Sequence, residues 1–138
     1  MMKANENKQA PLKSELLEIL NAYAFIKFAI LFGSMAQDGA KFESDIDLAV
    51  QGDQVLTVEQ KMQLTSDLAQ HFMRPVDLID LRTVGEPLLG QILVKGRRIM
   101  GSDTAYGDLI ARHVYAEADF MPYQRRLLKQ RRDAWIGR

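Results

Sequence analysis

Residues 33–50 read GSMAQDGAKFESDIDLAV, and they connect two short apolar runs. A Gly-Ser pair follows the first run, at residues 25–32, and an Asp-x-Asp pair opens the second, at residues 46–50. Apolar runs of this length, bounded by Gly and polar residues, are typical of buried strands. We therefore predict two strands, with the Gly-Ser pair at the end of the first and the Asp-x-Asp pair at the start of the second.

The rest of the chain alternates between helical and extended patterns. Apolar residues at helical spacing predict helices at residues 12–23, 57–72, 88–94, 106–120 and 123–135. Thr57 is placed to cap the second helix, whose expected apolar face consists of Met62, Leu64, Leu68, Ala69 and Phe72. Pro122 separates the last two helices, and further strands are expected at residues 76–81 and 98–100.

This order predicts an α/β (α+β) fold, a small mixed sheet flanked by helices. We expect a flexible leader at residues 1–11, a core at residues 12–100, and a C-terminal helical segment at residues 101–138 that packs on the core or on a partner. Hydrophobic residues make up 47% and charged residues 26% of the 138 residues, as in an ordinary globular domain.

Cysteine is absent, which excludes a disulfide framework and a thiolate metal site and fits a reducing compartment. The longest apolar stretch is too short to span a bilayer, and the polar N-terminus lacks a signal core, so we expect a cytoplasmic protein.

The net charge of zero results from an acidic first part of the chain and a basic second part. Residues 1–94 carry eight Lys and Arg against thirteen Asp and Glu, hence −5, and residues 95–138 carry ten against five, hence +5. The two parts complement each other, or the basic part binds a charged partner.

The Asp-x-Asp pair has a direct chemical consequence in a strand. Side chains alternate between faces, so Asp45 and Asp47 point the same way while Ile46 and Leu48 point into the core. Two carboxylates this close repel each other unless a cation lies between them. Mg²⁺ suits such a site, because it takes oxygen ligands and is held by one or two carboxylates together with substrate phosphates.

A third carboxylate is available in the later strand RPVDLIDL, which carries Asp77 and Asp80. Being three residues apart, they face opposite ways, and we expect Asp77 to join the pair if the strands are neighbours. Gly33 permits close approach of backbone to a ligand, and Ser34 offers a hydroxyl group to a phosphate. Together these groups suit nucleotidyl transfer, although each alone also fits a turn or a solvated strand end.

The spacing of residues 33–47 resembles the GSx10DxD signature of the minimal nucleotidyltransferase domain in the DNA polymerase β-like superfamily, over roughly residues 12–100. The resemblance implies transfer of a nucleoside monophosphate from an NTP, usually ATP, with release of pyrophosphate. It implies that Asp45 and Asp47 bind Mg²⁺, that Asp77 is the third carboxylate and assists the attacking hydroxyl, and that Gly33 and Ser34 grip the triphosphate. Ser44 is expected to approach the nucleotide.

The short chain and its tail, residues 108–136, also resemble the antitoxin half of MNT–HEPN toxin–antitoxin pairs. That resemblance implies a HEPN toxin as partner, with AMP transferred to one of its tyrosines. The spaced Arg and His of the HEPN motif are absent, because Arg112 and His113 are adjacent, so the chain is not the toxin. Two alternatives stay open: a binding-only antitoxin that occludes its toxin through the basic tail, and a small-molecule nucleotidyltransferase that acts as an oligomer. No membrane partner is expected, and direct nucleic-acid binding is disfavoured because stacking aromatics are not interleaved with the basic residues.

Overall fold

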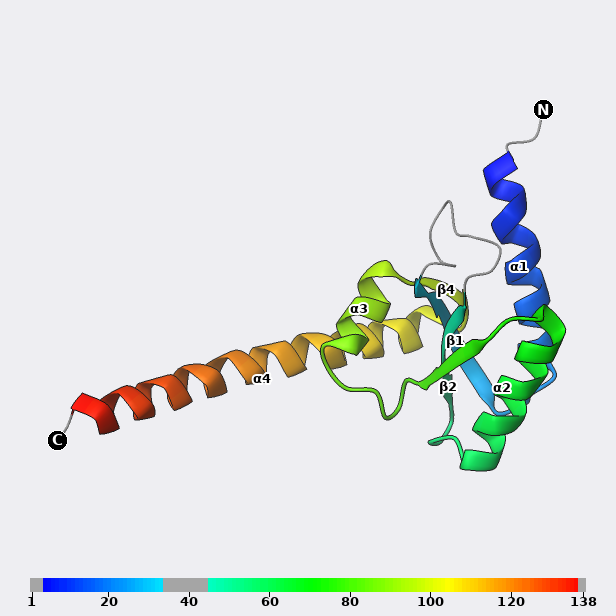
Figure 1. The fold of residues 1–138 in the computed structure, drawn as a ribbon. Helices are drawn as coiled ribbons and strands as arrows, with labels where there is room; N and C mark the ends of the chain where they lie inside the picture. The colour runs from blue at the N-terminus through cyan, green and yellow to red at the C-terminus, as the bar shows by residue number, and fades with distance from the viewer. Residues whose placement is uncertain (1–3, 34–44, 137–138) are drawn as a thin grey trace. The chain divides into compact units, whose positions relative to one another are not determined.

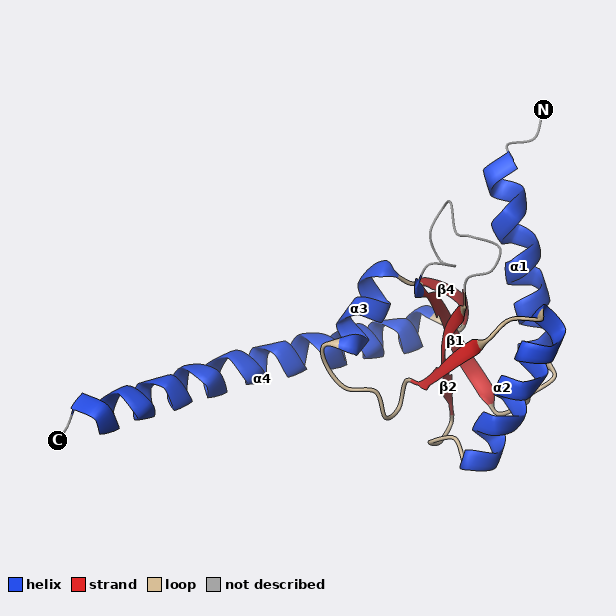
Figure 2. Cartoon of the chain, in the orientation of Figure 1, coloured by secondary structure: helices blue, strands red, loops and turns tan. Residues whose placement is uncertain are grey.

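The structure, a computed structural model, describes residues 4–33 and 45–136. The chain divides into two compact units, Met1–Asp103 and Thr104–Arg138. The first unit contains a four-stranded sheet with the strand order β3-β2-β1-β4. Figures 1 and 2 show this sheet with the helices around it. Its strands are β1 (Ile26–Phe32), β2 (Ile46–Gly52), β3 (Val76–Asp80) and β4 (Arg97–Met100). The predicted small mixed sheet and its four strands are confirmed.

The pairing of the strands sets the geometry of the site. β1 is antiparallel to both β2 and β4, whereas β3 is parallel to β2. The end of β1 and the starts of β2 and β3 therefore lie at one edge of the sheet. A parallel pair needs a crossover connection, and α2 (Val58–Phe72) provides it.

The start of α2 is fixed by its own side chains. The Thr57 hydroxyl accepts a hydrogen bond from the Gln60 amide at 3.0 Å, and the Gln60 side chain accepts one from the Thr57 amide at 2.9 Å. This reciprocal capping satisfies two amides that the first helical turn leaves without partners. The predicted Thr57 cap is confirmed. α3 (Leu88–Lys95) ends at Gly96, also as predicted.

Two helices extend beyond their predicted limits. α1 (Ala4–Asn21) begins eight residues before Leu12, so residues 4–11, predicted to be a leader outside it, are helical and Pro11 lies inside the helix. α4 (Asp103–Ile136) is one helix through Pro122, not two. A proline removes one backbone hydrogen bond and kinks or breaks a helix. In α1 and α4, residues with good helix propensity on both sides of the proline allow the helix to continue past Pro11 and Pro122.

Within the first unit, α1 and α2 lie on one side of the sheet and α3 lies on the other (Figure 2). The first side buries leucines of α1 and α2 against alternate residues of β2, namely Leu16, Leu20, Leu64, Leu68, Ile46, Leu48 and Val50. Met62, predicted on this buried face, is 67% exposed. It lies two residues from Leu64, which is about 200° around the helix. Because β2 alternates, Asp45 and Asp47 project toward the other side, where α3 packs on β1.

Candidate active site

Asp47 and Asp77 lie side by side on neighbouring strands. Each is the second residue of its strand, and the parallel register of β2 and β3 places Asp47 directly opposite Asp77. Parallel neighbours about 4.8 Å apart and in register present their side chains on the same face. The prediction that these strands are neighbours is confirmed, and Asp77 lies opposite Asp47. The membership of Asp77 in a three-carboxylate site stays a prediction.

Asp80 occupies the opposite face and has a structural task. It is only 6% exposed, and its two carboxylate oxygens accept hydrogen bonds from the backbone amides of Leu56 at 2.8 Å and Arg82 at 2.9 Å. Arg82 also donates from Nε to the Gly52 carbonyl. Asp80 thereby ties the segment after β2 to the segment after β3. Sequence reasoning missed this role, although the apolar Leu78, two residues earlier and on the same face of β3, was a signal in the sequence that this face is buried.

The three carboxylates interact electrostatically. Burial raises the pKa of Asp47 above its ordinary value of 3.8, and the negative charges of Asp77 and then Asp45 raise it further. This is the electrostatic situation that a bound cation relieves. Among the residues that the structure describes, no three Asp, Glu or His side chains are already arranged as a closed set of metal ligands. In proteins, Mg²⁺ is commonly held by one or two carboxylates together with substrate phosphates.

Gly33 is pressed against the Asp47 carboxylate at the end of β1. Phe32 pairs with Asp47, and Gly33 then takes a φ of 70°, in the left-handed region that favours glycine. A Cβ at residue 33 would collide with Oδ2 of Asp47 and would lie 2.9 Å from its Cγ. Glycine is thus required both by backbone conformation and by space. The sequence predicted close approach here but not that Asp47 is the neighbour. Ser34 and Ser44 lie outside the described residues.

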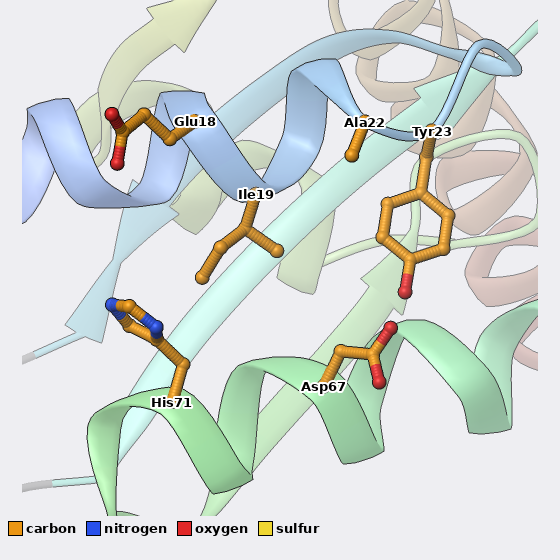
Figure 3. A pocket seen from close by; sticks show the side chains of 6 residues that line it. All are labelled: Glu18, Ile19, Ala22, Tyr23, Asp67 and His71. Carbon is orange, nitrogen blue, oxygen red and sulfur yellow. The ribbon is translucent and has the colours of Figure 1, made fainter.

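A pocket lies elsewhere, between α1 and α2 (Figure 3). It has a volume of about 550 Å³ and is lined by Glu18, Ile19, Ala22, Tyr23, Asp67 and His71. These helices pack on the face of the sheet opposite Asp47, so the pocket is separate from the carboxylates. Next to this pocket, His71 contacts Glu15, with 3.5 Å between Nε2 of His71 and Oε2 of Glu15.

No helix within the described part of the chain has the length and apolar character to cross a membrane.

Comparisons with known proteins agree with this geometry. The family model of polymerase β nucleotidyltransferases matches residues 14–105. The protein adenylyltransferase MntA of Shewanella oneidensis is 31% identical over 102 residues, which cover 74% of this chain and 69% of that protein.

Two solved structures share the fold. One is a toxin–antitoxin with AMP-PNP, with a TM-score of 0.73 and 22% identity over 86% of this chain and 96% of the matched one. The other is the tri-AMPylated Shewanella oneidensis HEPN toxin in complex with MNT antitoxin. Its TM-score is 0.72 and its sequence identity is 20%, and the match covers 88% of this chain and 97% of the matched chain.

Proposed function

Because this chain belongs to the polymerase β nucleotidyltransferase family, as its GSx10DxD motif predicted, we propose that it transfers AMP from ATP to a partner protein. The partner is a HEPN toxin and the acceptor is a tyrosine hydroxyl, so that the chain is the antitoxin of the pair. The name of the curated relative, a protein adenylyltransferase, supports this reaction. The AMPylated toxin in a structure of the same fold supports the partner.

The observation that carries the proposal is the register of Asp47 with Asp77, beside Asp45 at the start of β2. In the proposed roles, Asp45 and Asp47 hold Mg²⁺, and Asp77 completes the set of three. When bound, Mg²⁺ would supply positive charge that neutralises the negative charge developing on the phosphates of ATP. Asp77 is exposed, so it can meet an acceptor hydroxyl and take its proton during attack.

Other parts of the chain take roles that stay predictions. Gly33 and Ser34 bind the triphosphate. Residues 12–100 form the transferase core, and residues 101–138 contact the partner. ATP is consumed in the cytoplasm, where we place the reaction.

The test mixes the purified chain with the purified HEPN protein of the neighbouring gene, Mg²⁺ and ATP labelled at the α-phosphate. We expect label on the partner, mapped to tyrosine by mass spectrometry, and its loss with a chelator. A binding-only antitoxin would instead inhibit its toxin without labelling it, and Asp47→Asn would inhibit equally well. A small-molecule transferase would leave the toxin both unlabelled and active. Either result would overturn the proposal.

A further inference from the structure

The charges of α4 are separated along its length. Residues 104–119, which we call the acidic half, contain three Asp and Glu against one Arg, hence −2. Residues 120–136, the basic half, contain five Lys and Arg against one Asp, hence +4. Side chains of both halves, such as Glu117 and Arg131, are exposed. The two halves belong to one continuous helix (Figure 1), so α4 is acidic over one part of its length and basic over the other.

The dipole of the helix does not account for this separation. An acidic start and a basic end stabilise any helix, but the effect is confined to the first and last turns. The last turn of α4 contains no basic residue. Glu117 lies about four turns after the start of α4, and Arg126 lies about three turns before its end. The separation of charge therefore suits an interaction along the length of the helix.

An apolar stripe passes through both halves of α4. Apolar residues recur at intervals of seven, the spacing of a coiled-coil seam, at Val114, Met121, Leu128 and Trp135. Val114 is 54% exposed and Leu128 is 66% exposed, and Ile110, one turn before Val114, is 42% exposed. Most helices in proteins are stabilised by packing of an apolar face. A helix of 34 residues with this exposed stripe therefore suits another helix as its partner.

We propose that α4 forms the interface of a homodimer, in which the α4 helices of two copies of this chain pack antiparallel along the apolar stripe. A two-fold axis then places the acidic half of each copy beside the basic half of the other, and each contact occurs twice. A parallel pair would place the two basic halves side by side, where they repel each other. Charges beside an apolar seam decide the orientation of paired helices in this way.

A second copy complements α4 better than a partner of uniform charge does. An acidic protein surface or a nucleic acid would attract the basic half and be repelled by the acidic half. A second copy of α4 complements both halves at once, over a length of about 51 Å at 1.5 Å per residue. The inference goes beyond the proposed AMP transfer and concerns the chain without its toxin. A toxin bound to residues 101–138, as proposed above, would displace the second copy.

Sedimentation equilibrium of the full chain without toxin tests the pairing. We expect a reversible dimer whose dissociation constant rises roughly tenfold or more when the salt is raised to about 1 M, where charges are screened beyond about 3 Å. A dimer held by apolar contacts alone would not weaken with salt, and a parallel dimer would become tighter because its like charges are screened. Either result would overturn the antiparallel arrangement.

Charge reversal tests where the two copies meet. One variant, Asp108→Lys with Glu117→Lys, makes the acidic half basic, and a second, Arg131→Glu with Arg132→Glu, makes the basic half acidic. Each variant alone should dimerise roughly tenfold or more weakly than wild type, because like charges then lie side by side. An equimolar mixture of the two should dimerise at least as tightly as wild type, since each helix then meets one of opposite charge.

The matched control is Lys13→Glu with Lys61→Glu, which changes the net charge as much as the second variant does. Both lysines are exposed, on α1 and α2, and this control should dimerise like wild type. Circular dichroism checks that each variant is folded, and the salt dependence of the wild type needs no variant.

Three results would overturn the inference. A wild-type chain that stays monomeric throughout the micromolar range has no such interface. Reversal variants that dimerise like wild type would place the contact outside α4, and a mixture of folded variants that stays monomeric would exclude the pairing of opposite halves. Labelling of the toxin is measured separately, and neither result depends on the other.

Discussion

Three residues separate Asp77 from Asp80, and the alternation of β3 sends their side chains to opposite faces. Asp77 is exposed beside Asp47, whereas Asp80 is buried and accepts two backbone amides. The aspartate at position 77 is thus available for the proposed reaction, whereas the aspartate at position 80 stabilises the fold. What separates the two roles is which face of the sheet each carboxylate occupies.

Replacing each of these aspartates by alanine should give opposite results. Asp77→Ala should lower transfer by about 10²–10⁴-fold, the usual contribution of a general base, with little loss of stability. Asp80→Ala should cost about 1–3 kcal/mol for each amide left without an acceptor, while the folded protein stays active. Initial rates and urea unfolding on both variants measure this, and the reverse ranking would show that the roles are exchanged.

Asp47→Asn should abolish transfer without harming the metal-free fold. The raised pKa means that folded Asp47 binds a proton more readily than unfolded Asp47. Its contribution to stability is therefore greatest below 3.8 and is lost as the pH rises through the folded pKa. Asparagine carries no charge, so the melting temperature of the variant relative to wild type should rise from low pH to neutral pH in chelator. A variant less stable at neutral pH would contradict the electrostatic account.

Gly33→Ala should damage both the fold and the site. The left-handed conformation costs a residue with a Cβ about 1–2 kcal/mol, and the added methyl displaces the Asp47 carboxylate. Gly85→Ala is the control, because a Cβ there meets no atom within 4 Å and its φ is not in the left-handed region. The melting temperature and the rate of Mg²⁺-dependent transfer should fall for Gly33→Ala but not for Gly85→Ala. Equal losses in the two variants would show that the contact between Gly33 and Asp47 is not the cause.

At the scale of elements, α2 determines the relative positions of Asp47 and Asp77 because it connects the two strands that carry them. It is the crossover that makes β2 and β3 parallel, and its buried Leu64 and Leu68 hold it on the sheet. The pairing of Asp47 with Asp77 depends on that crossover. A helix that frays at its start would loosen the register that brings the two carboxylates together.

Thr57→Ala should therefore destabilise the chain by about 1 kcal/mol, as the loss of a helix cap usually does. Thr65→Ala is the matched control. The Thr65 hydroxyl only donates to the Lys61 carbonyl one turn earlier, and alanine is the better helix former. Urea midpoints measure both. A Thr65→Ala variant as unstable as Thr57→Ala would show that the capping interaction is not the cause.

For the whole molecule, charge is distributed unequally between the two units. Met1–Asp103 contains eleven Lys and Arg against fourteen Asp and Glu, hence −3, and Thr104–Arg138 contains seven against four, hence +3. On the second half of α4, Arg126, Arg131 and Arg132 are exposed, and so is Leu128, at 66%. Apolar anchors among basic residues suit a protein partner with an acidic surface.

Deleting residues 122–138 should weaken the complex with the toxin while slow acceptor-independent chemistry continues, because the carboxylates belong to the first unit. The wild-type affinity should also fall as salt rises, since charge steers the encounter. Circular dichroism and pull-down at matched concentration test this. An unfolded truncation would place the tail in the core, and a folded one that binds undiminished would make it a solvated helix.

The sequence by itself determined the strands, the Thr57 cap and the opposite orientations of Asp77 and Asp80 on β3. These follow from local periods, two residues in a strand and 3.6 in a helix, which the residues themselves display. It placed the ends of α1 and α4 wrongly, because it treated Pro11 and Pro122 as boundaries that neighbouring helix formers override.

The tertiary structure alone decided which residues meet. Gly33 touches Asp47, Asp80 holds the Leu56 amide 24 residues away, and Gly96 fits against β1. Each contact joins distant segments, and it exists only because the buried faces of the sheet fix the strand register. The strand register cannot be predicted from local sequence patterns, because it is determined by packing across the whole core.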